Sequence, residues 1–205
     1  MVLSTALIGG GAVALPVYAQ TASARTAAPP TRVRGTIESV NAGTVVVKTR
    51  GGATTSVKLG DKTTYGWVVP ISISAVKTGA YIGTAALSEP DGSLKALEIH
   101  VFPASMRGAG EGHRGWDLGA NSSMTNGTIG SVTNVDGRTL KLTYKGGEQT
   151  VHVPPKTPIV TFEPATAAEV LKPGSHAFIL AAQAPDGSLT ALSVRAGKHG
   201  SVPPM

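Results

Sequence analysis

The segment from Met106 to Leu118 carries the side chains with the most varied chemistry in this chain. It places glutamate, histidine, arginine, tryptophan and aspartate among glycines, in a chain that has only 2 tryptophans. Glycines that alternate with functional side chains indicate a tightly folded backbone rather than a loose tether. The residues that we expect to make specific contacts are Arg107, Glu111, His113, Arg114, Trp116 and Asp117.

A metal site is one chemistry that these side chains could support. His113, Glu111 and Asp117 would supply ligands, and His100 would join them from the end of the preceding strand. Imidazole nitrogens together with carboxylate oxygens suit Zn²⁺, Cu²⁺ or Ni²⁺. The spacing matches no recognised metal motif, and ordering a glycine-rich loop around an ion costs conformational entropy. A periplasmic divalent-metal-binding protein is therefore the alternative function, and only in that case do we expect a cofactor.

Two other interpretations of the same segment stay open. In the structural one, Trp116 fills the seam between two domains, Arg114 pairs with Asp117 or Glu111, and His113 donates a hydrogen bond to a carbonyl. In the recognition one, Arg114 and Trp116 anchor a protein, a glycan or a small anion, as these residue types do in many interfaces.

Catalysis finds little support in the sequence. A serine nucleophile needs a base within hydrogen-bond reach and an oxyanion site. The chain contains neither a Gly-x-Ser-x-Gly elbow nor a His-Glu-x-x-His motif. We therefore expect a protein that is not an enzyme, and a hydrolase ranks third among the functions considered.

The elements that position this segment are repeated along the chain. Gly35–Val40 returns 92 residues later as Gly127–Val132, and Pro90–Leu94 returns 95 residues later as Pro185–Leu189. Recurrence at such a spacing indicates a duplicated structural unit. Each copy alternates apolar and polar residues over short segments that are separated by Gly and Asp-Gly turns, a pattern typical of strands joined by tight hairpins.

The order of elements in each copy predicts an all-β fold. It reads as three strands, a short helical segment (73–77 or 165–171) and two more strands. This order fits two tandem OB-like antiparallel small β-barrels, in which closure removes exposed strand edges. The aromatic residues lie in or beside predicted strands and are expected to fill the barrel cores, so nucleic acid is not an expected partner.

The pattern also resembles a known family. Gly-x-Ile-x-x-Val, a Gly turn, and Asp-Gly-x-Leu-x-Ala-x-x-Val look like a widespread bacterial exported domain of unknown function with an OB-like barrel, here in tandem. The second copy matches more closely, through Gly127–Ile129, Leu171–Gly174 and Asp186–Ala191. Some relatives carry the label metal ABC transporter permease, which this sequence does not support because a permease needs several spanning helices.

Composition and the first residues predict the location of the protein. An apolar run from Leu3 to Leu15, followed by Val17-Tyr18-Ala19, is typical of an export signal. With no cysteine in the chain, disulfides, thiol catalysis and Cys-ligated metals are excluded. The net charge of +6 is dispersed and forms no basic patch. The expected segments are a signal peptide (1–19), a flexible leader (20–32), repeat 1 (33–103), a Gly-rich ordered connector loop (104–125), repeat 2 (126–196) and a flexible tail (197–205).

These observations favour a periplasmic or secreted accessory protein of the cell envelope that works by binding. We expect no membrane span after removal of the signal peptide. The partner would be an envelope protein, a glycan or a small ligand, and the specific contacts would come from residues 106–118.

Overall fold

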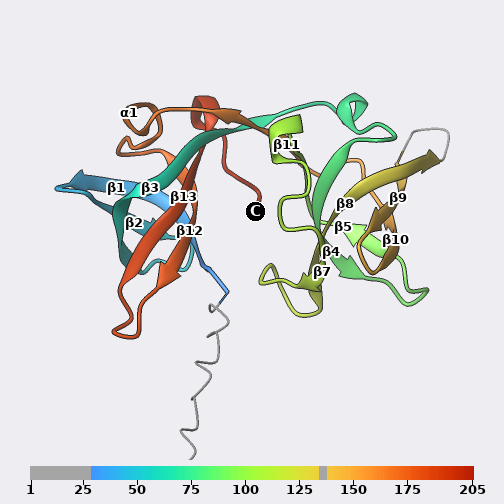
Figure 1. Cartoon of the computed structure of the whole chain (residues 1–205), viewed down its shortest axis with the longest axis horizontal. Coiled ribbons are helices and arrows are strands. Elements are labelled where there is room, and N and C mark those ends of the chain that lie inside the picture. The colour runs from blue at the N-terminus through green and yellow to red at the C-terminus, as the bar shows by residue number, and fades with distance from the viewer. Residues whose placement is uncertain (1–28, 134–137) are drawn as a thin grey trace, which may run out of the picture.

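The computed structural model describes residues 29–133 and 138–205, and within them the protein is all-β (Figure 1). Its 13 strands belong to one hydrogen-bonded sheet, and the only α-helix of the described residues is the short α1 (Ala167–Val170). No helix in this part of the chain is long and apolar enough to cross a membrane. The predicted signal peptide and most of the predicted leader lie outside the described residues.

Five strands close into a barrel, which we call the first barrel. Hydrogen-bonded pairing runs in the order β13–β12–β1–β2–β3 and returns from β3 to β13, so no strand of this set keeps a free edge. The strands are β1 (Thr31–Asn41), β2 (Thr44–Thr49), β3 (Thr54–Pro70), β12 (His176–Gln183) and β13 (Leu189–Gly197).

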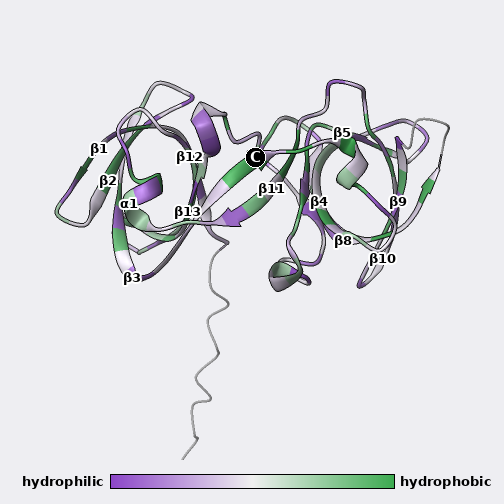
Figure 2. Cartoon of the chain, turned by 90° about the horizontal axis from the view of Figure 1, so that it is seen from above, coloured by the Kyte–Doolittle hydropathy of each residue, from purple (hydrophilic) through white to green (hydrophobic). Residues whose placement is uncertain are grey.

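A second set of five strands is paired in a ring, which we call the second ring. Its order is β4–β5–β10–β9–β8, and β8 pairs with β4 again. Figure 2 shows the first barrel and the second ring side by side, each seen as a hoop. The strands are β4 (Tyr81–Ser88), β5 (Leu94–Ala96), β8 (Ser122–Thr133), β9 (Thr139–Tyr144) and β10 (Gly147–His152).

The pairing crosses the domain boundaries expected from the sequence. The first barrel takes its last two strands from the second copy, and the second ring takes β4 and β5 from the first copy. The prediction that residues 33–103 and 126–196 each close a barrel is therefore wrong. The physical reason lies in β3, whose 17 residues span about 55 Å and carry the chain away from the first barrel before β4 begins.

Two further strands connect the sets. The end of β3 pairs with β11 (Ile159–Pro164), β11 pairs with β6 (Ile99–Val101), and β6 pairs with β4 of the second ring. This path makes the sheet continuous between the first barrel and the second ring.

Two aliphatic cores fill the interiors. The core of the first barrel is made mostly of valine and alanine with Ile37 and Ile179, and that of the second ring is made of valine, isoleucine, leucine and alanine. Of the aromatic residues that the structure describes, only Tyr65 and Trp67 pack against the first core, and none belongs to the second. A third cluster contains Phe162 and Phe178, and Phe102 packs against it. The expectation that aromatic side chains fill the barrel interiors is therefore wrong for most of them.

The repeated motifs have the same local structure in both places. The β1–β2 pairing has a register shift between Ile37 and Ser39, and the β8–β9 pairing has one between Ile129 and Ser131, 92 residues later. The Pro-Asp-Gly-Ser turns match as well, because Gly92 and Gly187 both have a φ of 83°. In both turns the aspartate accepts a hydrogen bond of 2.9 Å from the backbone N–H of the serine.

Three expected segments differ from the structure. The connector contains a 3-10 turn (Ala104–Met106) and the strand β7 (Gly112–Gly115), and β8 begins at Ser122, so it is only partly a loop. The leader ends earlier than expected, because β1 begins at Thr31. The tail is packed rather than flexible: Arg34 Nε donates to the Met205 carbonyl at 2.6 Å, and Arg50 donates to the Pro203 carbonyl.

Candidate functional site

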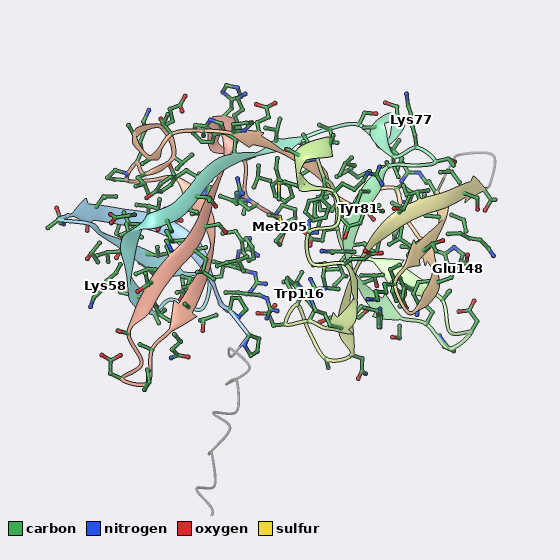
Figure 3. The ribbon with its side chains drawn as sticks, in the orientation of Figure 1. Lys58, Lys77, Tyr81, Trp116, Glu148 and Met205 are labelled. Atoms are coloured by element: carbon green, nitrogen blue, oxygen red, sulfur yellow. The ribbon has the colours of Figure 1, made fainter. Side chains whose placement is uncertain are left out.

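A pocket of about 230 Å³ lies between the first barrel and the second ring. Figure 3 shows Met205 and Trp116 in this region, with Tyr81 on the side of the second ring. Larger hollows of about 370 and 460 Å³ lie around Arg50 on the first barrel. No residue that lines these two hollows has a buried polar atom without a hydrogen-bond partner. Three residues that line the pocket of about 230 Å³, which we call the central pocket, have such an atom.

Aromatic rings and methionines form the apolar wall of the pocket. The ring centroids of Phe102 and Phe162 lie 5.5 Å apart, and the His100 ring lies 5.3 Å from Phe102 and 5.7 Å from Phe162. Such separations are typical of packed aromatic pairs. The apolar lining consists of Phe102, Met106, Met124, Phe162, Phe178, Leu180 and Met205, together with Ala109 and Gly110.

His100 is held in the wall by a glycine on the neighbouring strand. It pairs with Gly83 across β6 and β4, and a Cβ at position 83 would lie 2.2 Å from His100 Nε2. Only glycine therefore leaves room for the imidazole at this position. The residue is 5% exposed, and its Nδ1 atom has no hydrogen-bond partner.

Glu98 lies beside His100 without lining the pocket itself, and it is fully buried. Its Oε1 atom lies 3.7 Å from His100 Nδ1, and neither carboxyl oxygen has a hydrogen-bond partner in the described structure. Burial raises the pKa of Glu98 to about 8, against the opposing charges of Arg34 and Arg50. Burial, aided by the charge of Arg114, lowers the pKa of His100 to about 4. Between these values the pair holds one proton and carries no net charge.

Two more residues that line the pocket have a buried polar atom without a partner. Asn126 donates from Nδ2 to the Ala109 carbonyl at 3.0 Å, which leaves its buried Oδ1 unpaired. The indole N–H of Trp116 is also buried and unpaired. Native structures rarely leave buried polar atoms unsatisfied, so each such atom calls for an explanation.

Two arginines reach the pocket from opposite sides. Arg114 on β7 donates from Nη1 to the Gly110 carbonyl at 2.8 Å, and Arg195 on β13 donates from Nη1 to the Tyr65 carbonyl at 3.2 Å. Neither forms an ion pair with an acidic side chain among the described residues. Burial lowers the pKa of both guanidinium groups, which nevertheless stay charged as arginines do in proteins.

Arg195 is accommodated in the same way as His100. It pairs with Gly66 on β3, where a Cβ would lie 2.1 Å from Arg195 Nη1. Its guanidinium carbon lies 5.7 Å from the Phe162 ring, which fixes it against the apolar wall.

Residues 116 and 117 join the connector to the first barrel. The guanidinium of Arg32 lies 3.7 Å from the centre of the Trp116 ring. Asp117 accepts two hydrogen bonds from Arg34, at 2.7 and 2.9 Å, and these bonds are the main cause of its lowered pKa. Because β7 itself pairs with β8 of the second ring, these contacts tie the two parts together.

The structure does not bring the predicted metal ligands together. His113 Nδ1 lies 2.8 Å from Thr125 Oγ1, Glu111 accepts from the backbone N–H of Lys145, and Asp117 pairs with Arg34, while His100 lies beside Glu98. No group of three or more histidine and acidic residues in the described chain could hold a metal ion. The predicted pairing of Arg114 with Asp117 or Glu111 is also wrong, and His113 contacts a hydroxyl rather than a carbonyl.

Of the predicted contact residues, Arg114 and Trp116 line the pocket, as does His100 from the metal hypothesis. Arg107 lies elsewhere, where it donates to the Gly79 carbonyl at 2.7 Å. Glu98, Arg195, Met205 and the three phenylalanines were not predicted from the sequence as site residues. The 95-residue offset offered one signal, because it aligns His100 with Arg195 within otherwise similar strands.

Comparison with known proteins bears on one part of the chain. Neither the curated proteins nor the solved structures give a match. Residues 129–195 match the family model described as a domain of unknown function (DUF5666), which covers less than half of the chain. The matched segment contributes strands to both the second ring and the first barrel. This segment is therefore similar to a family whose description assigns no function, in agreement with the resemblance seen in the sequence.

Proposed function

We propose that this chain is a non-enzymatic protein of the cell envelope that binds a small molecule in the central pocket. The envelope location rests on the apolar first residues of the sequence. We propose a duplicated OB-like unit as the origin of the scaffold. The ligand would bind where the first barrel and the second ring meet.

One observation carries the proposal. The central pocket combines an apolar lining with buried polar atoms of His100, Trp116 and Asn126 that have no partner. Ligand pockets commonly have this composition and often lie where two structural units meet. A volume of about 230 Å³ corresponds to roughly eight water molecules at about 30 Å³ each, which suits a small organic molecule.

We propose that the central pocket binds its ligand without forming or breaking a covalent bond. Ser193 and His100 both line it, and no hydrogen bond joins them in the described structure. A serine nucleophile requires such a contact with its base.

Trp116 provides a direct test, because it lies in the pocket wall. In a Trp67→Phe variant, Trp116 is the only tryptophan left. Titration with 4-nitrobenzyl alcohol, a small neutral aromatic quencher, should quench its fluorescence in a saturable way. Ser193→Phe should fill the pocket and abolish saturation, whereas Ser56→Phe, at an exposed position on β3, should not.

The thermal melting temperature of each variant checks that it folds. Quenching that stays linear with quencher concentration in the Trp67→Phe protein would show that the pocket takes no such ligand. Equal quenching in the two Ser→Phe variants would contradict the location of the site.

The methionines suggest a second candidate occupant, a soft monovalent cation such as Cu⁺. All three methionines of the described chain, Met106, Met124 and Met205, line the pocket with His100. Thioether and imidazole groups are ligands that Cu⁺ accepts. This candidate ranks second, because Arg114 and Arg195 repel a cation and methionine also fills irregular apolar gaps without any metal.

Anaerobic Cu⁺ titration against a chromogenic chelator distinguishes the two candidates. A copper site requires one equivalent of Cu⁺ to be retained by the wild type and lost in the Met124→Leu, Met205→Leu double variant. Retention that is equal in both proteins, or no retention at all, excludes it.

A further inference from the structure

We infer that the ligand of the central pocket is a small apolar carboxylic acid, bound as its anion between Arg114 and Arg195. This inference rests on the proposed function and adds the chemical class of the ligand.

The first support is a surplus of positive charge. Arg114 and Arg195 each use Nη1 for a backbone carbonyl and have further N–H groups without an acceptor in the described chain. A guanidinium has five donors in a planar fork that matches a carboxylate. Arg34 shows the contrasting case, because it binds Asp117 through two nitrogens and the Met205 carbonyl through the third.

The second support is the absence of an acidic side chain from the pocket wall. Glu98, the carboxyl beside His100, is fully buried and contacts neither arginine through a hydrogen bond or an ion pair. Neither Glu98 nor any other acidic residue of the described chain lines the pocket. Two charges of the same sign in a partly desolvated site attract an anion more strongly than they would in open water.

The third support is the division of the lining into two parts. Arg114 and Arg195 come from β7 and β13, on opposite sides of the boundary between the second ring and the first barrel. The remaining wall is aromatic and thioether in character, through Phe102, Phe162, Phe178 and Met124. A molecule with one anionic end and an aromatic or branched apolar body satisfies both parts, whereas an inorganic anion leaves the apolar wall uncovered.

Asn126 refines the ligand class. Its buried Oδ1 accepts no hydrogen bond from the described residues, while its Nδ2 donates to the Ala109 carbonyl. An acceptor in this position pairs with a hydroxyl or N–H donor on the ligand. We therefore expect a donor next to the carboxylate, as in a 2-hydroxy acid, to strengthen binding.

The experiment compares matched nitroaromatic ligands, with the fluorescence of Trp116 in the Trp67→Phe protein as the readout. 4-Nitrophenylacetate should bind at least tenfold more tightly than 4-nitrophenylacetamide and 4-nitrobenzyl alcohol. Arg114→Gln and Arg195→Gln should each weaken the acid about tenfold or more and leave the alcohol within about twofold. Arg107→Gln, on the same connector but outside the pocket, should leave the acid unchanged.

The outcomes separate this inference from the proposed function. If acid, amide and alcohol bind equally, or the two pocket variants behave like Arg107→Gln, the carboxylate is not the recognised group, although the pocket still binds. If the alcohol binds and the acid does not, the inference is also overturned. If none of the three compounds quenches in a saturable way, the proposed function fails together with it.

Discussion

The strands that follow the two Pro-Asp-Gly-Ser turns share their scaffold and differ where they face the pocket. Leu94 and Leu189 begin them, and Ile99 and Val194 are both fully buried. At the alternate positions, Glu98 corresponds to Ser193 and His100 to Arg195 under the 95-residue offset. One strand thus brings a buried neutral pair, of which His100 lines the pocket, and the other brings a hydroxyl and a charged guanidinium.

The first strands of the two copies differ in the same manner. Gly35 and Gly127 are both required, because a Cβ would lie 2.0 Å from the Lys48 carbonyl oxygen and 2.6 Å from the Thr143 carbonyl oxygen, respectively. One position earlier, Arg34 on β1 binds Asp117, whereas its counterpart Asn126 on β8 lines the pocket. Positions that hold each ring together are alike, and positions that face the other ring have diverged. The two rings are therefore alike in these scaffold positions and unlike at the site.

The largest expected effect on stability comes from substituting equivalent core residues in the first barrel and the second ring. Ile37 and Ile129 are related by the 92-residue offset and are each 1% exposed. We expect Ile37→Ala and Ile129→Ala each to lower the free energy of unfolding by about 2–5 kcal/mol, through lost burial and the cavity left behind. Urea unfolding followed by circular dichroism measures both values.

The exchange of strands adds a condition to this prediction. Because each ring takes strands from both copies, both variants should show one cooperative transition with a lower midpoint and an unchanged slope. Two separate transitions, with only one shifted by each substitution, would show that the first barrel and the second ring unfold independently.

The next test concerns Glu98, whose counterpart Ser193 does not titrate. The pKa of Glu98 is about 8 in the folded protein, above the usual value of 4.5 expected for the unfolded chain. The unfolded chain therefore releases this proton at a lower pH than the folded protein does. The free energy of unfolding consequently falls as the pH rises from 4.5 towards 8. His100, with a folded pKa of about 4, opposes this trend only below its usual value of 6.5. Between pH 6.5 and 8 the free energy of unfolding should therefore fall by about 2 kcal/mol, at about 1.36 kcal/mol per pH unit.

Glu98→Gln should remove this fall, while Ser193→Ala should leave it in place. Urea unfolding at a series of pH values measures the slopes. If wild type and Glu98→Gln have parallel profiles between pH 6.5 and 8, the carboxyl is ionised in the folded protein, and the neutral pair of Glu98 and His100 does not exist.

The local structure of the repeats could be predicted from the sequence, because it depends on short signals. The Asp-Gly turns after Pro90 and Pro185, the strand residues that follow Gly127 and the aliphatic core positions all follow from neighbouring residues. The choice of pairing partner could not be predicted. Both copies carry the same strand pattern, so either set of first strands can pair with either set of last strands, and no local signal distinguishes the two arrangements.

The site was found only in part for the same reason. Arg114 and Trp116 stood out because unusual residues gathered in one short segment. Phe178 and Arg195 lie in ordinary-looking strands and reach the pocket only through the exchanged pairing. An aromatic residue in a strand has the same sequence pattern whether it faces the interior of its barrel or a neighbouring ring.

The smallest predicted effect concerns the contact that ties the connector to the first barrel. Asp117→Asn should lower the free energy of unfolding by about 1 kcal/mol at neutral pH, because Asp117 is 42% exposed and solvent screens its pair with Arg34. Its pKa is lowered chiefly by the Arg34 hydrogen bonds, so the stabilisation is present above 3.8 and is lost as the pH falls through the folded value. The loss should shrink in high salt, and Asp61→Asn, at an exposed residue, should cost less. A double-mutant cycle with Arg34→Gln isolates the pair from the Arg34 bond to Met205. If the coupling energy is zero, the pair of Asp117 and Arg34 does not stabilise the fold, and the exchanged strands hold the first barrel and the second ring together without it.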